Sequence, residues 1–97
     1  MKNLVLEGVK LLEAEEGRNF TIEYFITKKA SRETDQTIYG VAVMKKEGLN
    51  AEMESVDNIT YNYDEIKKIS EGLRKFDVTP MGLVEATDML VTAIICG

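Results

Sequence analysis

The chain has 97 residues, of which 44% are hydrophobic and 30% are charged, and its formal net charge is −5. This length suits one hydrophobic core, so we expect residues 1–97 to form a single domain. An acidic chain lacks the clustered Lys and Arg that displace counterions from a phosphate backbone, which excludes nucleic acid as the expected partner.

Residues 3–15 predict a first strand that is interrupted at Gly8. Leu4 and Leu6 fall on one parity of the strand, whereas Val9 and Leu11 fall on the other. A β-bulge at Gly8 brings both pairs to the same side of a sheet. We therefore expect one strand with a bulge in this segment.

Three more strands are predicted over residues 19–28, 37–46 and 49–56. In the first of them Phe20, Ile22, Tyr24 and Ile26 alternate with the other side chains, which is the period of a strand. The connections are too short for a parallel crossover, so neighbouring strands are expected to be antiparallel. The result is a four-stranded antiparallel β-meander.

The last third of the chain predicts two helices joined by a hinge at residues 76–80. Asn62 followed by Glu65 is a capping-box pattern at the start of the first helix. Thr79 is expected to cap the second helix, with Pro80 at its first position. The predicted apolar stripes are Ile66, Ile69, Leu73 and Phe76 in the first helix, and Leu83, Ala86, Thr87, Leu90, Val91, Ile94 and Ile95 in the second.

The predicted fold class is therefore α+β, with the meander followed by two C-terminal α-helices packed on one face. The sequence does not decide which face the helices cover. Gly40 and Ala42 are small, so we expect a helix to approach the sheet most closely on the face that they share. Gly72 lies inside the first helix, where close helix packing is the usual compensation for its cost.

The residue types present argue against an enzyme. The chain has no histidine, which removes the commonest general base and the usual nucleophile pairs, and it has a single cysteine, Cys96. It has no Gly-rich phosphate loop and no paired-cysteine zinc motif. Glu13, Glu15 and Glu16 form an acidic group, which we interpret as a solvated turn rather than a cation site. We expect no catalytic residue, no cofactor and no metal.

Apolar side chains predict an interaction surface instead. Phe25, Tyr39, Val41 and Val43 are expected on the sheet face that the helices leave uncovered, and a contiguous apolar patch marks a partner surface. Leu90 and Ile94 of the last helix form a rival patch. The expected partner is a second copy, as a homodimer, or another protein. Two alternatives stay open: strand twist and the N-terminal segment cover the face, or a pocket between sheet and helices binds a small molecule or is an active site.

The expected compartment is the cytoplasm, without a membrane partner. The apolar run after Lys2 ends at Glu7, and this run is too short for a secretory signal. The longest apolar run, residues 89–96, is well below the roughly 20 residues of a membrane span.

Three short segments carry a family resemblance. Tyr39-Gly40-Val41, Asp57-Asn58-Ile59-Thr60 and Asp77-Val78-Thr79-Pro80-Met81-Gly82-Leu83 resemble, in order and spacing, a family of short uncharacterised bacterial proteins of Firmicute type. The resemblance covers most of residues 18–95. It implies strands followed by a final helix led by Val-Thr-Pro, and it implies no activity and no site residues.

Overall fold

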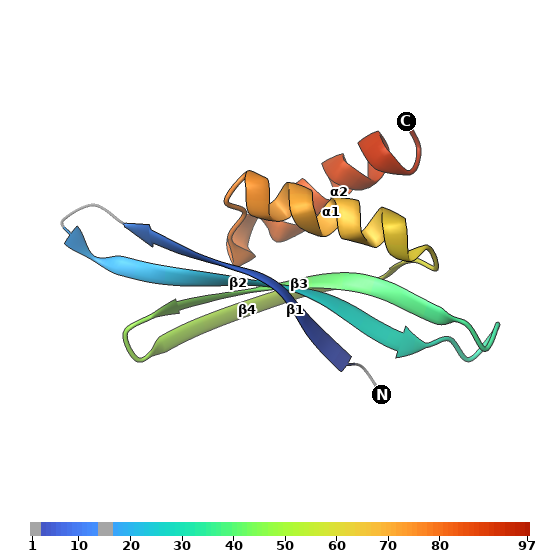
Figure 1. Cartoon of the computed structure of the whole chain (residues 1–97), viewed down its shortest axis with the longest axis horizontal. Coiled ribbons are helices and arrows are strands. Elements are labelled where there is room, and N and C mark those ends of the chain that lie inside the picture. Colours follow the sequence, from blue (N-terminus) through green and yellow to red (C-terminus); the bar gives the residue numbers. More distant parts are fainter. Residues whose placement is uncertain (1–2, 14–16) are drawn as a thin grey trace.

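The computed structural model of the chain describes residues 3–13 and 17–97. Four strands form one sheet in the order β1-β2-β3-β4, with every neighbouring pair antiparallel. Two helices follow, with a short 3-10 turn before the second (Figure 1). The predicted α+β meander with two C-terminal helices is confirmed. The elements are β1 (Asn3–Glu13), β2 (Asn19–Ala30), β3 (Thr37–Glu47), β4 (Asn50–Thr60), α1 (Tyr63–Lys75), η2 (Pro80–Gly82) and α2 (Leu83–Ile94).

Both helices lie on the same side of the sheet, and the other side carries no helix (Figure 1). The core lies between these two layers and takes its side chains from β2, β3, α1 and the start of α2. Its fully buried members are Ile22, Tyr24, Ile26, Val41, Val43, Ile66, Ile69, Leu73 and Leu83. Burial of these large side chains is the main force that holds the helices on the sheet.

The register between β2 and β3 decides which side chains face the helices. Phe25 is paired with Ala42, and Ile26 is paired with Val41. Directly paired residues point to the same side of a sheet, so Tyr39, Val41 and Val43 belong to the helix-covered face and Phe25 to the opposite one. The prediction that these four residues share one uncovered face is wrong, because the relative phase of two strands is fixed by their register.

The bulge predicted in β1 is confirmed. The pairing shifts between Leu6 and Gly8, so Leu6 lies opposite Phe25, and Gly8 lies opposite Tyr24. After the shift Val9 is paired with Glu23, which is on the same face as Phe25. Leu4, Leu6, Val9 and Leu11 therefore all point away from the helices.

Gly40 makes room for β4 rather than for a helix. A Cβ atom on Gly40 would lie 2.3 Å from the backbone oxygen of Val56 and 2.9 Å from the Cα of Asp57. At this point the β3–β4 pairing is irregular, and Asn58 has a left-handed φ of 57°. The expectation of a close helix approach here is wrong, and β4 continues to Thr60 instead of ending at residue 56.

The start of α1 is capped as predicted, with one addition. The side-chain oxygen of Asn62 accepts a hydrogen bond from the Glu65 backbone N–H at 3.1 Å. The Thr60 hydroxyl accepts from the Asn62 N–H at 3.0 Å and donates to the Glu65 carboxylate at 2.7 Å. The reciprocal half of the capping box thus runs through Thr60 rather than directly between its two members.

The second helix starts differently from the prediction. Thr79 has an extended backbone, but its side chain makes no capping hydrogen bond, and Pro80 opens η2 before α2 begins at Leu83. Phe76 leaves the predicted stripe of α1 and is mostly exposed at the C-terminal cap. Gly72 allows close helix packing, because a Cβ atom there would lie 2.7 Å from a methyl group of Leu90.

Candidate functional site

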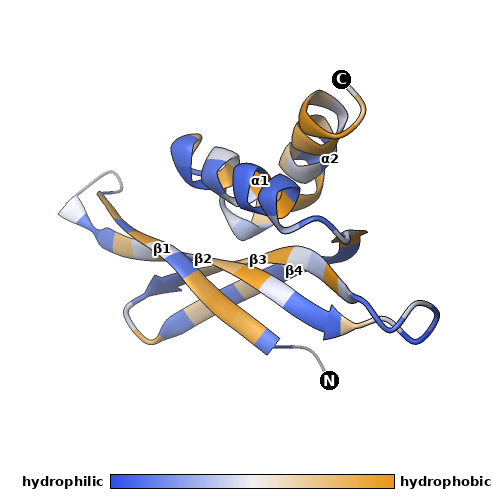
Figure 2. Ribbon diagram, turned by 45° about the vertical axis from the view of Figure 1, so that its right-hand side comes forward, coloured by the Kyte–Doolittle hydropathy of each residue, from blue (hydrophilic) through white to orange (hydrophobic). Residues whose placement is uncertain are grey.

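The sheet surface turned away from the helices carries four exposed apolar side chains in a row along β1. We call this surface the open face. On β1, Leu4 is 44%, Leu6 51%, Val9 52% and Leu11 71% exposed. Figure 2 shows the corresponding orange stretches along β1. The pairing adds Phe25 from β2, Ala42 and Met44 from β3, and Met53 from β4.

The open face holds one ion pair, with Glu23 near the middle of β2 and Lys46 near the end of β3. The Lys46 ammonium lies 2.8 Å from the Glu23 carboxylate, and the two side chains belong to neighbouring strands. We considered the described part of the sheet between the cross-strand pair Leu4–Thr27 and the pair Leu11–Thr21. Among the paired residues there, Glu23 and Lys46 are the two with charged side chains on the open face. The centre of the open face is therefore apolar and close to neutral, within a chain of net charge −5.

The six side chains predicted to form an interaction surface are separated by the structure. Val41 and Val43 are fully buried under the helices. Tyr39 is half-buried and packs edge-on against Tyr63 at 5.5 Å between ring centroids. Of the six, only Phe25 lies on the open face. The remaining two, Leu90 and Ile94, are half-buried and pack from α2 against the core.

The side chains of β1 were not predicted as an interaction surface, although the sequence carried the signal for them. The parity switch at Gly8 predicts that four apolar side chains share one side of β1. What was missing is that this side is the uncovered one, which follows from the β1–β2 register.

A second apolar area lies between the C-terminal end of α1, the segment that follows it and the middle of α2. Phe76, Val78, Ala86, Met89 and Leu90 line a hollow of about 250 Å³. Phe76 and Met89 are mostly exposed at its rim. The hollow is small compared with the roughly 300–1,000 Å³ of typical ligand pockets, so it suits one inserted side chain better than a cofactor.

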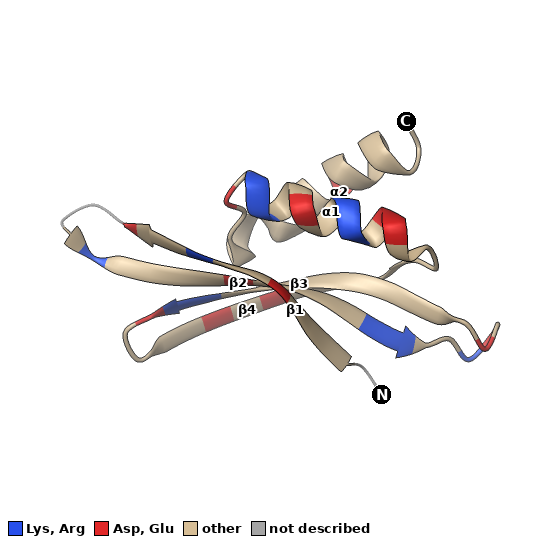
Figure 3. Ribbon diagram, viewed as in Figure 1, with Lys and Arg blue, Asp and Glu red and all other residues tan. Residues whose placement is uncertain are grey.

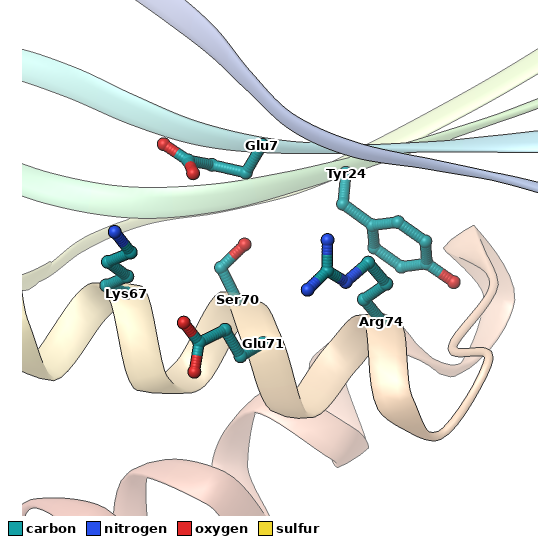
Figure 4. A pocket seen from close by; sticks show the side chains of 6 residues that line it. All are labelled: Glu7, Tyr24, Lys67, Ser70, Glu71 and Arg74. Atoms are coloured by element: carbon teal, nitrogen blue, oxygen red, sulfur yellow. The ribbon is translucent and has the colours of Figure 1, made fainter.

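A polar cleft of about 250 Å³ lies between β1 and α1 (Figure 4). Two cationic and two anionic side chains line it, so their formal charges sum to zero. Its lining residues are Glu7, Tyr24, Lys67, Ser70, Glu71 and Arg74. Gly8 lies beside it, and a Cβ atom there would come within 2.8 Å of the Arg74 side chain.

Tyr24 connects this cleft to the segment between the helices. Its hydroxyl donates a hydrogen bond to the Val78 carbonyl at 3.1 Å. Burial, with a smaller effect from the nearby Asp77 carboxylate, raises the pKa of Tyr24 to about 12. The hydroxyl therefore stays protonated at neutral pH, and Asp77 itself is paired with Lys10 of β1.

The described part of the chain contains no group of three or more His, Cys, Asp or Glu side chains placed to hold a metal ion. Of the acidic group discussed above, Glu13 ends β1, and Glu15 and Glu16 lie outside the described residues. Over residues 3–13 and 17–97, no helix has both the length and the apolar character needed to cross a bilayer.

The comparison with protein families supports the resemblance to an uncharacterised family. A family model with the description "Family of unknown function (DUF6514)" matches residues 3–93. The chain belongs to this family, and the match spans all four strands and both helices up to residue 93. Comparisons with curated proteins and with solved structures gave no match.

Proposed function

We propose that this chain is a non-catalytic protein-binding module that uses the open face of its sheet. The observation that supports the proposal is the row of half-exposed Leu4, Leu6, Val9 and Leu11 on one side of β1. An antiparallel sheet can leave one face in water, but that face is normally polar. A contiguous apolar surface on a small protein is typical of a site that another protein covers.

The apolar side chains of this surface supply part of the free energy that binding of a partner requires. Complete burial of a Val or Leu side chain contributes about 1.5–3 kcal/mol, so covering a half-exposed one contributes about 1 kcal/mol. The four residues of β1 together would add about 4 kcal/mol, before Phe25 and Met53 are counted. The partner in this proposal is a protein in the cytoplasm of a bacterial cell, in keeping with the Firmicute-type resemblance and the single cysteine.

Site-specific photo-crosslinking in cells tests this proposal. A photoreactive amino acid replaces Leu6 on the open face in one variant and Lys68, which is exposed on α1, in a matched control. We expect the Leu6 variant to form a discrete protein adduct that the Lys68 variant does not form, as seen by mass spectrometry. An equal adduct pattern from both positions, or no adduct from Leu6, would contradict the proposal.

A second candidate function is small-molecule binding in the polar cleft. Lys67, Ser70 and Arg74 all project from α1 toward the sheet there, with Arg74 beside Tyr24, and this arrangement supports it (Figure 4). A metabolite screen by thermal shift tests this candidate. We expect a true ligand to raise the midpoint of unfolding of the natural chain and to lose this effect in Arg74→Ala. A screen in which no compound distinguishes the two proteins would remove the candidate.

A further inference from the structure

We propose that the partner of the open face is a second copy of this chain, and that the two copies pack open face to open face about a two-fold axis. This inference rests on the proposed function, since it names the partner of the same surface. Three properties of the open face carry it: its area, its charge and its position in the layer order of the fold.

The area of the open face matches that of a stable interface. Strands lie about 4.8 Å apart and rise about 3.3 Å per residue, so four strands with about ten paired rows cover about 600 Å². A standard interface buries about 800 Å² of accessible surface on each partner. Because accessible surface follows the relief of the side chains, it exceeds the flat footprint, and one sheet face is enough.

The charge distribution favours a like copy on this side. Two chains of net charge −5 repel each other where their acidic surfaces meet. On the open face the carboxylate of Glu23, near the middle of β2, is already paired with Lys46 of the same chain. Figure 3 shows that α1, on the opposite side, displays alternating acidic and basic residues. Approach through the open face therefore buries no unpaired like charges at its centre.

A second copy would also cover the side of the sheet that carries no helix. One chain has a helical layer and a sheet layer, and its sheet is covered on one side only (Figure 1). Two sheets pack face to face at about 10 Å with interdigitating side chains, as in β-sandwiches. Two copies would form four layers, helices–sheet–sheet–helices. A two-fold axis closes this assembly at two chains, because the same patch is used on both.

The mass of the full chain in solution is the first test. We expect sedimentation equilibrium to give twice the chain mass of 10.9 kDa. Leu6→Lys is expected to raise the dissociation constant at least about 100-fold, since it places an unpaired charge from each copy in an apolar interface. The matched control is Val84→Lys, which also replaces an exposed apolar side chain by lysine, at a position of α2 that is 62% exposed. Circular dichroism of both variants checks that they fold.

The ion pair between Glu23 and Lys46 provides a second test with an internal rescue. Glu23→Lys leaves two neighbouring cations on each open face and is expected to weaken association about 10-fold or more. The double variant Glu23→Lys with Lys46→Glu restores a neutral pair and is expected to recover most of the loss. Glu23→Lys with unchanged association would contradict the face-to-face arrangement.

Crosslinking separates this arrangement from pairing of two β1 edges. In a Cys96→Ser background, single cysteines are placed at Leu6 on β1 and at Met53 on β4, at opposite edges of the sheet. A two-fold axis in the plane of the interface places each edge of one sheet over either the same edge or the opposite edge of the other. A short bis-maleimide is therefore expected to join two copies either as the like pairs Leu6–Leu6 and Met53–Met53 or as the mixed pair Leu6–Met53. Crosslinks between two Leu6 positions, with no crosslink that includes Met53, would overturn the inference in favour of edge pairing.

The outcomes also separate this inference from the proposed function. A chain that stays monomeric at high concentration overturns the second-copy inference. If the Leu6 photo-crosslinker then captures a different protein in cells, the proposed binding function of the open face still holds. If it captures nothing, both fail.

Discussion

Tyr24 is the side chain whose ionisation should be visible in the stability of the fold. Its hydroxyl is buried and donates to the Val78 carbonyl. Its pKa is about 12 in the folded chain and 10.0 for an unperturbed tyrosine. The folded state therefore keeps the proton at a pH where the unfolded chain releases it. This contribution to stability is complete below pH 10 and is lost as the pH rises towards 12.

Tyr24→Phe should accordingly change the alkaline limb of the stability profile. At neutral pH we expect a loss of about 1 kcal/mol in the free energy of unfolding, the net value of one hydrogen bond. Between pH 10 and 12 we expect the variant to lose less stability than the natural chain. Urea unfolding at each pH measures both effects. Tyr61→Phe, at an exposed tyrosine, is the control and should follow the natural profile.

At Gly40 the backbone of β4 leaves no room for a side chain, whereas at Gly82 the space around the residue is open. A Cβ atom on Gly40 would meet backbone atoms of Val56 and Asp57, which cannot rotate away. We expect Gly40→Ala to lower the free energy of unfolding by about 1–3 kcal/mol, the range for overpacking. At Gly82 a Cβ atom meets no atom within 4 Å, so Gly82→Ala should be neutral or stabilising by up to about 1 kcal/mol. Equal losses in chemical denaturation would contradict this account.

The starts of the two helices differ in a way that mutation can measure. Asn62 caps α1 through a side-chain hydrogen bond to Glu65, whereas the Thr79 side chain makes no such bond before α2. We expect Asn62→Ala to destabilise the fold by about 1 kcal/mol, the usual value of an N-cap. Thr79→Ala should cost less than about 0.5 kcal/mol. Thermal unfolding of the two variants under the same conditions makes the comparison, and a larger loss at Thr79 would show that its hydroxyl does cap the helix.

At the scale of the elements, the sequence contained most of the fold but not the relation between strands. Alternation in residues 19–28 and the cap at Asn62 are local patterns, and both predicted elements are present. The parity switch at Gly8 is also local, and the bulge is confirmed. Local patterns are sufficient here because each arises from neighbours along the chain.

The phase of β3 against β2 is not local, and here the prediction failed. Each strand alternates correctly by itself, but a shift of one residue in the connecting segment exchanges the two faces. The pair Ile26–Val41 sets this phase and places Val41 in the core. The sequence therefore predicted an uncovered apolar face from four residues, with its covering left open as an alternative, and of these four only Phe25 lies on the open face. The exposed apolar side chains come mainly from β1, which only the pairing of β1 with β2 shows. The close approach of β4 to Gly40 was missed for the same reason, since it depends on a tertiary pairing.

At the scale of the whole molecule, polarity is divided between the two sides of the sheet. The helical side carries the ionic surface of α1, and the open face carries exposed apolar side chains around one ion pair (Figures 2 and 3). If two copies meet through their open faces, attraction comes from apolar contact and repulsion comes from the net charge of −5 on each chain. These two terms respond differently to salt, because screening acts on charges.

Association of the chain should therefore become stronger as salt is added. Raising the ionic strength from about 0.01 M to about 1 M shortens the screening length from about 30 Å to about 3 Å, which removes most of the repulsion between two acidic chains. We expect the dissociation constant from sedimentation equilibrium to fall several-fold over this range. Sodium chloride is the appropriate salt, since sulfate also strengthens apolar burial directly. An increase in the dissociation constant would mean that ion pairs between the two copies, rather than the apolar residues of β1, hold the interface.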